Sequence, residues 1–384
     1  MQIAIDYTSA LTQGGGIARY TREAVSALAR LDTPHRYTLV YTKEAADGRP
    51  ALPPHFAWRE LPVSARQAAI VWQRMRLPLP VDRWIGPVDV YHSPDFTLPP
   101  LSRARGIVTV HDLSFLATPQ YHDPALQRYL AAAVPRAVSH AQHILADSEH
   151  TRVELVARLA TPPEKISVVY PGVDPRFRPL EWQDPQDDAL LQRARAAYGL
   201  DNPFILTVGT IEPRKNHEAI IRAYALLHRE GAIEHELVVA GGGGWQSTKE
   251  SLLRLVDDLR LGGDVLFPGF VSDELLPALY NLAALVVYPS HYEGFGLPVL
   301  EALACGTPVL TARNTSLPEA GGDVARYVDN SSDVAELAAA IHTALSDETL
   351  REQSLRDGPA HAAGFTWEHT ARSLLNVYER VGKA

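Results

Sequence analysis

The sequence has almost no cysteine. Cys305 is the only one among 384 residues, so the chain cannot form an intramolecular disulfide. It follows an apolar helical stretch, which favours a buried structural thiol over a nucleophile. A chain without disulfides fits a reducing cytoplasm.

Long apolar stretches are also lacking. No window holds about 18 uninterrupted apolar residues, as a transmembrane helix would need. The start, MQIAIDYTSA, has neither the basic leader nor the apolar segment of a signal peptide. We therefore expect a soluble cytoplasmic protein, or one attached peripherally at the inner face of the cell membrane.

An excess of positive charge is missing as well. The formal net charge is −9, so the chain lacks the overall basic character of a nucleic-acid-binding protein, and we expect no nucleic-acid partner. Cysteine and histidine residues at zinc-type spacing and internal repeats are not found either.

The chain does contain an alternation of strand-like apolar runs and helical stretches. Its 384 residues exceed the usual single core and favour two domains. The alternation is typical of βαβ units and predicts an α/β fold with doubly wound, mainly parallel sheets. The predicted strands lie at 3–6, 37–41, 88–92, 106–110, 143–146 and 166–169, and then at 204–208, 236–240, 265–267, 285–288 and 308–311.

A proline-rich stretch, YPGVDPRFRPLEWQDPQD at 170–187, separates the two sets of strands and cannot be one regular element. We place one domain at 1–175 and the other at 188–365, followed by a terminal helix at 366–384. Two such sheets would face each other across a cleft, and open α/β sheets bind ligands beyond the carboxyl ends of their strands.

The most informative motif is HYEGFGLPVLEALACGTPVL, which starts at residue 291. Glu293 lies in a loop after a predicted strand, and Pro298 suits the first turn of a helix, where we also place Glu301. Free amides at the helix start favour an anion, and the glycines allow close approach. Each acid alone is ordinary, but the pair suits a ligand with a diphosphate between two sets of hydroxyls, as in a sugar nucleotide.

A glycine run, Gly14 to Gly16, follows the first predicted strand and precedes a helix that we expect to start near Ile17. The spacing is not G-x-G-x-x-G, and no acid ends the second strand, so a nicotinamide or flavin site is disfavoured. The run is either a mobile loop or a ligand cradle.

Two further strand ends carry polar side chains. His111 and Asp112 form either a structural pair or a contact to sugar hydroxyls and a departing phosphate. Arg214 and Lys215 stand at an expected helix start, where the dipole opposes cations, so they either face water or neutralise a diphosphate. The loops AGGGGWQS (240–247) and PGFVSDELL (268–276) are simple turns or could admit a nucleobase.

Taken together, the segments GGGIARYT, TVHDLSF, VGTIEPRKN, GFVSDELLPALY, PSHYEGFGLPVLEALACGTPV and SLPEAGGD resemble the retaining, nucleotide-sugar-dependent glycosyltransferases of the GT-B fold, group 1 or family four. The resemblance covers nearly the whole chain. Its most specific part is E-G-F-G-L-P-x-x-E-A. The form G-I-x-R-Y-T looks like the branch rich in bacterial mannosyltransferases.

By this resemblance, Glu293 would bind hydroxyls of the transferred sugar and Glu301 the ribose hydroxyls. Arg214 and Lys215 would hold the phosphates, and His111 would sit beside the sugar. The remaining donor-binding positions would be Gly15 and Gly16, which close on donor or acceptor, Val271 beside the base, Gly209 and Gly294, and the backbone amides of Phe295, Gly296 and Leu297 near the diphosphate.

One departure from the pattern is Thr210, where some relatives have arginine, so more of the phosphate binding would fall to Arg214. The family is generally metal-independent, and no cofactor is expected. Its last helix commonly crosses back onto the N-terminal domain, and FTWEHTARSLLNVYERV at 365–381 has the amphipathic spacing for this.

The resemblance implies transfer of a hexose, with mannose from GDP-mannose as the best candidate, to a glycan or lipid-linked saccharide in surface polysaccharide synthesis. The departing phosphate would take the acceptor's proton, and the configuration would be retained. A GT-B epimerase or phosphorylase and a non-catalytic sugar-nucleotide-binding protein are the alternatives.

The stretch ARQAAIVWQRMRLPLPVDRW at 65–84 combines four arginines with two tryptophans and a methionine. It is either a packed helix with a basic exposed face or a peripheral contact to an anionic membrane, as would help with a lipid-linked acceptor.

Overall fold

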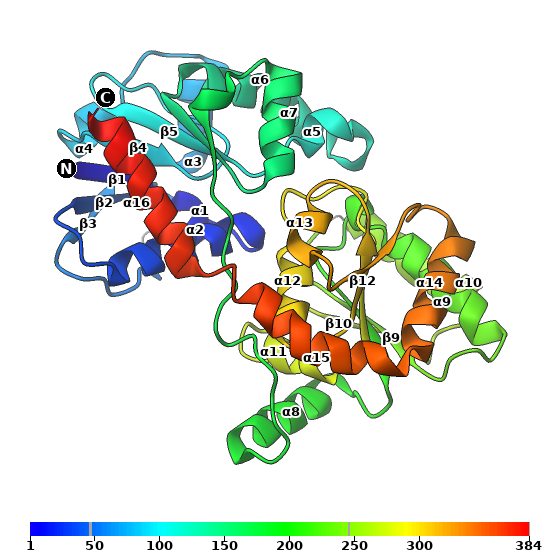
Figure 1. Cartoon of the computed structure of the whole chain (residues 1–384). Coiled ribbons are helices and arrows are strands. Elements are labelled where there is room, and N and C mark those ends of the chain that lie inside the picture. The colour runs from blue at the N-terminus through cyan, green and yellow to red at the C-terminus, as the bar shows by residue number, and fades with distance from the viewer. Residues whose placement is uncertain (46–47, 245, 384) are drawn as a thin grey trace. The chain divides into compact units, whose positions relative to one another are not determined.

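The computed structural model describes residues 1–45, 48–244 and 246–383, so residue 245 of the predicted glycine loop lies outside the described residues. The chain divides into two compact units (Figure 1). Unit 1 comprises Met1–Gly172 and Trp367–Ala384, and unit 2 comprises Val173–Thr366.

Unit 1 is built on a seven-stranded parallel sheet with the order β3-β2-β1-β4-β5-β6-β7. Its central strands are buried apolar runs, as expected for parallel strands covered on both faces. The order reverses between β1 and β4, which makes their carboxyl ends the topological switch point. The strands are β1 Gln2–Asp6, β2 Arg36–Tyr41, β3 Phe56–Glu60, β4 Val90–Ser93, β5 Arg105–Val110, β6 His143–Ala146 and β7 Ile166–Val168.

The last helix of the chain, α16, belongs to unit 1 and runs alongside α2 (Figure 1). Its apolar face, including Trp367, Leu374 and Tyr378, is buried in the same core as β1. The helices of this unit are α1 Thr8–Thr12, α2 Gly16–Arg30, α3 Ala65–Ala68, α4 Asp82–Ile85, α5 Ser114–Ala117, α6 Pro124–His140, α7 Glu149–Leu159 and α16 Trp367–Lys383, with a π-helical turn at Ala69–Arg74 and 3₁₀ turns at Lys43–Ala45, Pro119–Tyr121 and Pro163–Lys165.

Unit 2 has a six-stranded parallel sheet with the order β10-β9-β8-β11-β12-β13. Here the order reverses between β8 and β11, so their carboxyl ends form the switch point of this sheet. The strands are β8 Phe204–Val208, β9 Glu236–Ala240, β10 Val265–Gly269, β11 Leu285–Tyr288, β12 Val309–Ala312 and β13 Arg326–Val328.

Helices of unit 2 alternate with these strands, as the βαβ pattern predicted. They are α8 Pro185–Tyr198, the 3₁₀ turn η5 Pro213–Lys215, α9 His217–Arg229, α10 Gln246–Asp258, α11 Leu276–Leu282, α12 Leu297–Ala304, α13 Leu317–Gly321, α14 Val334–Ser346 and α15 Glu348–Ala362.

The predicted fold, with two doubly wound sheets and a terminal helix that returns to the first unit, is confirmed. Two edge strands were missed, β3 and β13: the first is largely exposed and the second has only three residues, so neither shows a buried apolar run. The expected helix at 65–84 is wrong as one element. The helical part ends at Arg74, and α4 begins only at Asp82. The segment 75–81 between them is not helical, because its prolines cannot continue a helix.

Candidate functional site

A compact group of ionisable side chains lies at the carboxyl ends of β8 and β11, the switch point of unit 2. We call Glu212, Arg214, Lys215, Tyr288 and Glu293 the charged cluster. The 3₁₀ turn η5 carries the two cations, which lie just past β8 and directly before α9, as predicted.

Glu293 is the centre of this cluster and is only 6% exposed. Its Oε1 accepts hydrogen bonds from Lys215 Nζ at 2.6 Å and from the Tyr288 hydroxyl at 2.9 Å, while Arg214 Nη1 donates to Oε2 at 3.0 Å. Lys215 also donates to the Tyr288 oxygen at 2.6 Å. Arg214 Nη2 also donates a hydrogen bond to Glu212 Oε1 at 2.7 Å, which holds the guanidinium in place. The sequence-predicted residues Arg214, Lys215 and Glu293 are thus brought into direct contact.

The cluster holds Glu293 in its charged form. Burial alone would raise the pKa of Glu293, but the charges and hydrogen bonds of Lys215 and Arg214 lower it to about 2. Burial lowers the pKa of Lys215, against the opposing effect of Glu293. Lys215 can still donate a hydrogen bond to a ligand. Within the part of the chain that the structure describes, its ammonium group donates two of its three hydrogens to protein atoms.

Tyr288 and Glu212 were missed as members of this site. Tyr288 is the last residue of a strand that the sequence indicates to be simply buried, and nothing local shows that its hydroxyl meets Glu293. Glu212 is the acid of I-E-P-R-K, two residues before Arg214. This short spacing could have predicted that the two side chains pair.

The loop between β12 and α13 fixes the backbone around Glu293. Ser316 Oγ donates to the carbonyl oxygens of Glu293 at 2.9 Å and of Phe295 at 3.0 Å, and Thr315 Oγ1 accepts the amide of Glu293 at 3.2 Å. Gly296 has φ 113°, and a Cβ there would lie 3.0 Å from a side-chain carbon of Leu317. The turn into α12 therefore needs glycine at this position.

The predicted helix after this turn is α12, and Pro298 lies in its first turn as expected. Glu301 was placed there too, which is wrong: it is the fifth residue of α12 and so belongs to the second turn. It is 2% exposed, and its Oε2 accepts a hydrogen bond from the Tyr280 hydroxyl at 3.0 Å. Leu297 opens the helix, and Gly294 lies partly buried in the preceding loop.

Two other predicted donor-binding positions follow strands of the same sheet. Gly209 comes directly after β8 and its amide donates to the Ala240 carbonyl at 2.9 Å, while side-chain atoms of Lys215 lie 3.6 Å from the position a Cβ would take. Val271 comes two residues after β10 and is buried. All predicted positions of unit 2 therefore lie at the carboxyl edge of its sheet or in α12.

In unit 1, His111 follows β5 and is buried. Its Nδ1 pairs with Asp147 Oδ2 at 2.6 Å, and its Nε2 with the Pro94 carbonyl at 2.7 Å. The partner acid is therefore Asp147, which follows β6, and not the adjacent Asp112. That carboxylate instead accepts hydrogen bonds from the amide and hydroxyl of Ser114.

This pairing favours the protonated, positively charged form of His111, while burial acts against the charge of both partners and also raises the pKa of Asp147. Burial alone would lower the pKa of His111, but Asp147, the Pro94 carbonyl and the nearby Asp95 raise it to about 9. Both ring nitrogens are engaged by protein oxygens. A protonated His111 would therefore act on a ligand mainly through its charge.

The glycine run of unit 1 lies at the start of α2. Gly15 caps the helix with φ 90°, Gly16 is its first residue, and open space surrounds the position of a Cβ at both. Gln13 Nε2 donates to Asp95 Oδ2 at 3.1 Å, which links the turn between α1 and α2 to the loop after β4. Gly15, Gly16 and His111 all lie in unit 1.

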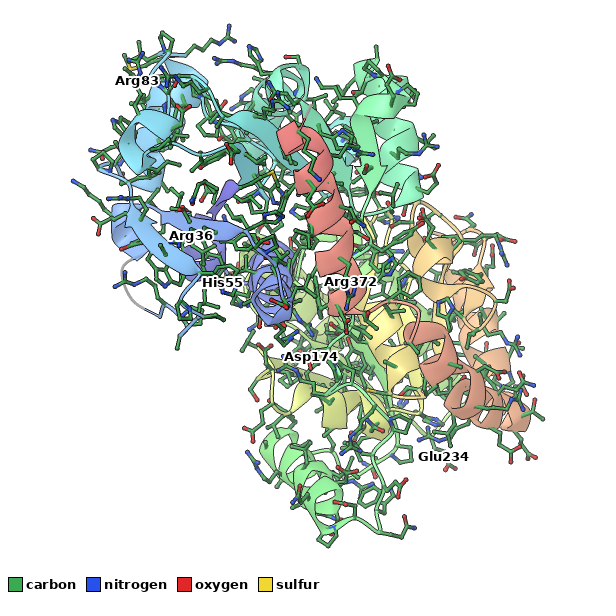
Figure 2. All side chains as sticks on the ribbon, turned by 60° about the vertical axis from the view of Figure 1, so that its left-hand side comes forward. Arg36, His55, Arg83, Asp174, Glu234 and Arg372 are labelled. Atoms are coloured by element: carbon green, nitrogen blue, oxygen red, sulfur yellow. The ribbon has the colours of Figure 1, made fainter. Side chains whose placement is uncertain are left out.

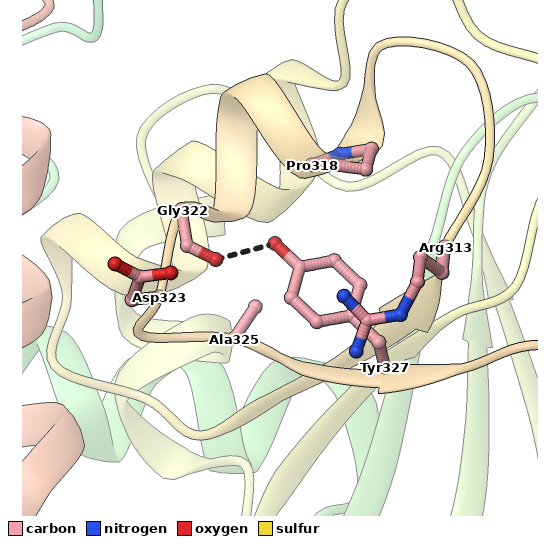
Figure 3. Close-up of a pocket in the computed structure, with 6 residues that line it drawn as sticks. All are labelled: Arg313, Pro318, Gly322, Asp323, Ala325 and Tyr327. Atoms are coloured by element: carbon pink, nitrogen blue, oxygen red, sulfur yellow. Dashed lines mark hydrogen bonds between the residues drawn. The ribbon is translucent and has the colours of Figure 1, made fainter.

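A separate cavity of about 310 Å³ lies against α13 in unit 2 (Figure 3). The Arg313 guanidinium covers the Tyr327 ring at 4.5 Å, and the Tyr327 hydroxyl donates to the Gly322 carbonyl at 2.7 Å. One face of the Tyr327 ring is thus covered, and the residues that line the cavity include none of the predicted donor-binding residues.

Comparisons with known proteins bear on the family and the fold of the chain. The family model described as Glycosyltransferase Family 4 matches residues 14–177, and the model described as Glycosyl transferases group 1 matches residues 191–358. Among solved structures, Anabaena Alr3699/HepE in complex with UDP and glucose is similar, with a TM-score of 0.74 and 18% identity over 99% of this chain and 100% of the other.

Two curated relatives match at higher sequence identity. The chain is 35% identical to O-antigen chain mannosyltransferase B of Escherichia coli over 291 residues, which are 76% of this chain and 74% of the relative. It is 31% identical to the serotype-specific mannosyltransferase WbdA of Escherichia coli over 72% of this chain, although it spans only 34% of that protein's length. The chain therefore belongs to the group 1 glycosyltransferases, a family of the GT-B fold.

Proposed function

We propose that the chain is a retaining glycosyltransferase that moves a hexose from a nucleotide sugar to a saccharide acceptor. The best candidate donor is GDP-mannose, and the proposed acceptor is a glycan or lipid-linked saccharide of surface polysaccharide synthesis. The names of the two Escherichia coli relatives, an O-antigen chain mannosyltransferase and a serotype-specific mannosyltransferase, support this choice.

The charged cluster is the observation that carries the proposal. It places Lys215, which donates two of its three ammonium hydrogens to described residues, at the switch point where open α/β sheets bind ligands. The start of α12, next to Glu293, supplies backbone amides that favour a phosphate. A carboxylate can accept about four hydrogen bonds, so Glu293 can still accept one from a sugar hydroxyl.

In the proposed reaction, the bond between the anomeric carbon and the diphosphate oxygen breaks while the acceptor oxygen attacks from the same face. The acceptor's proton passes to the departing phosphate oxygen, so the configuration is retained. Lys215 and the amides at Phe295 to Leu297 would stabilise the negative charge that develops on the diphosphate. Glu293 would bind the sugar in the transition state and does not act as a nucleophile.

The other half of the donor would contact Glu301 through its ribose hydroxyls. Glu301 would have to exchange the Tyr280 hydroxyl for a ribose hydroxyl or accept both. We propose that the reaction runs without a metal ion, because Arg214 and Lys215 would supply the positive charge that the diphosphate needs. Activity that survives exhaustive treatment with EDTA would support this, and restoration by added Mg²⁺ would contradict it.

The test is a panel of nucleotide sugars with the full chain. Thermal shifts would identify the base and then the hexose, and sugar release in the absence of acceptor would identify a transferase active site. Proton NMR of the glycoside product would give its anomeric configuration. Saturable nucleotide binding without sugar release would favour a non-catalytic binding protein, and an inverted product would contradict retention.

We also propose a peripheral membrane contact in unit 1. Four apolar side chains of the 65–84 segment are exposed, and four exposed arginines accompany them; Arg83 is labelled in Figure 2. Exposed apolar groups within a basic rim suit an anionic bilayer surface. No helix among the described residues is long and apolar enough to cross a membrane. The apolar residues are Ile70, Met75, Leu77 and Leu79, and the arginines are Arg66, Arg74, Arg76 and Arg83.

Sedimentation with liposomes tests this contact. The chain should sediment with vesicles that contain phosphatidylglycerol, and changing two of the arginines to glutamate should release it. Binding that does not respond to these changes would contradict the proposed surface.

A further inference from the structure

The cavity against α13 lies wholly within unit 2 and shares no lining residue with the charged cluster. It lies between α13 and β13, and Figure 3 shows Asp323 at one end of it and Arg313 at the other, with Ala325 between them. Ligand pockets in proteins usually span about 300–1,000 Å³, so a cavity of about 310 Å³ has room for a small ligand such as one sugar residue.

The two charged side chains of the cavity have unused hydrogen-bonding capacity. Among the described residues, Arg313 uses one of its five N–H donors, because Nε donates to Asp329 Oδ1 at 2.9 Å. The Asp323 carboxylate accepts no hydrogen bond within the same part of the chain, and both side chains are exposed. A ligand in the cavity would therefore meet hydrogen-bond donors at one end and acceptors at the other.

The Tyr327 ring gives the cavity an apolar wall. Its hydroxyl donates to the Gly322 carbonyl at 2.7 Å, and the Arg313 guanidinium lies 4.5 Å from the ring centroid. These two contacts fix the ring, and Pro318 and Ala325 add further apolar atoms to the lining. A sugar residue has the matching surface, with hydroxyls that donate and accept around a ring of C–H groups.

The charges of the cavity favour a neutral ligand. Arg313 is paired with Asp329, and Asp323 adds a second carboxylate, so one positive and two negative groups leave a net charge of −1. This charge opposes a phosphate. A metal ion is disfavoured too, because no group of three or more acidic, histidine or cysteine side chains that could hold one occurs among the described residues.

We propose that this cavity binds a neutral hexose residue of the glycan acceptor, at a distance from the sugar that reacts. This inference rests on the proposed function, because that function supplies the glycan. The helix α13 has five residues, about 7.5 Å, and directly follows Ser316, which holds the carbonyl of Glu293. A glycan held at this cavity is thus kept at high local concentration near the charged cluster.

Isothermal titration calorimetry of the full chain with mannotriose tests the site; the sugar is chosen because the proposed donor is GDP-mannose. D323A and R313Q should each weaken binding by about tenfold, because each removes hydrogen bonds to a charged group. D258A is the matched control, since it removes an exposed carboxylate of α10 in the same unit and should leave binding unchanged. All three variants should bind GDP as the unchanged chain does.

Unchanged mannotriose binding by both D323A and R313Q would overturn the site. A loss in D258A as large as that in D323A would overturn it too, because the effect would then be one of overall charge. These titrations contain no donor, so they are decided separately from the proposed function. That function fails if the unchanged chain releases no sugar from any nucleotide sugar.

Discussion

Replacing Glu293 by glutamine tests the charged cluster most directly. The substitution keeps the shape of the side chain and removes its charge, so Lys215 and Arg214 lose the carboxylate that they share. Both cations are largely buried in unit 2 and cannot recover full hydration. Removal of one partner from a buried ion pair typically costs about 3–5 kcal/mol.

The lowered pKa of Glu293 gives a second, independent value for the loss of stability. The pKa of Glu293 falls from an ordinary 4.5 to about 2 on folding, because the two cations outweigh the effect of burial. At about 1.36 kcal/mol per pKa unit, this corresponds to about 3 kcal/mol of stability at pH 7. Because the folded pKa is lowered, the contribution is complete above pH 4.5 and is lost as the pH falls toward 2.

Differential scanning calorimetry of the full chain measures this effect, since its two units need not unfold together. In a unit of this size, about 3 kcal/mol lowers the melting temperature by about 6–12 °C. The E293Q transition should therefore fall by that amount at pH 7. At pH 3 the difference should shrink to about 1.4 kcal/mol, because the wild-type chain has lost most of the contribution.

Glu218→Gln is the matched control. Glu218 lies in α9 of the same unit, is exposed, and pairs with Arg222 on the surface, so its loss should cost under about 1 kcal/mol. Turnover with E293Q should fall far more than nucleotide affinity. An E293Q transition within 2 °C of the control, or a shift that is equal at pH 3 and pH 7, would refute the reasoning.

Four further substitutions, one of them a control, probe the charged cluster, the glycine loop and the His111 pair. Tyr288→Phe removes the hydroxyl that bridges the charged cluster and should cost about 1–2 kcal/mol by calorimetry, whereas no loss would show that the bridge is dispensable. Gly244→Ala should destabilise the chain by at least about 2 kcal/mol because a Cβ would strike a carbonyl oxygen at a positive φ, while Gly16→Ala, in open space, should be nearly neutral. Asp147→Asn should lower stability by about 3 kcal/mol at pH 6 and by about 1.4 kcal/mol at pH 8, because the pKa of His111 is raised to about 9 and its contribution is present below pH 6.5 and lost as the pH rises through 9. Chemical denaturation between pH 6 and pH 9 measures the free energy of unfolding. If the D147N variant kept the pH dependence of the wild-type chain, the His111–Asp147 pairing would be contradicted.

The sequence predicted the sheets well because buried parallel strands leave a strong local signal. Runs such as 204–208 and 285–288 are continuous apolar stretches between turns, and they became β8 and β11 without change. The edge strands β3 and β13 left no such signal. The segment 65–84 shows the opposite error, since its amphipathic pattern continued across prolines that end the helix.

For the site, the sequence determined which backbone turns could face a ligand: Gly296 before α12, and Arg214 and Lys215 after β8 are local features of the chain. Tertiary structure decided which side chains meet. Tyr288 reaches Lys215 across 73 residues, and His111 finds Asp147 across 36. Such partners are set by strand order, because parallel strands that are distant in sequence end side by side at one edge of a sheet. The local sequence pattern predicts where each strand lies but not the order of the strands in the sheet.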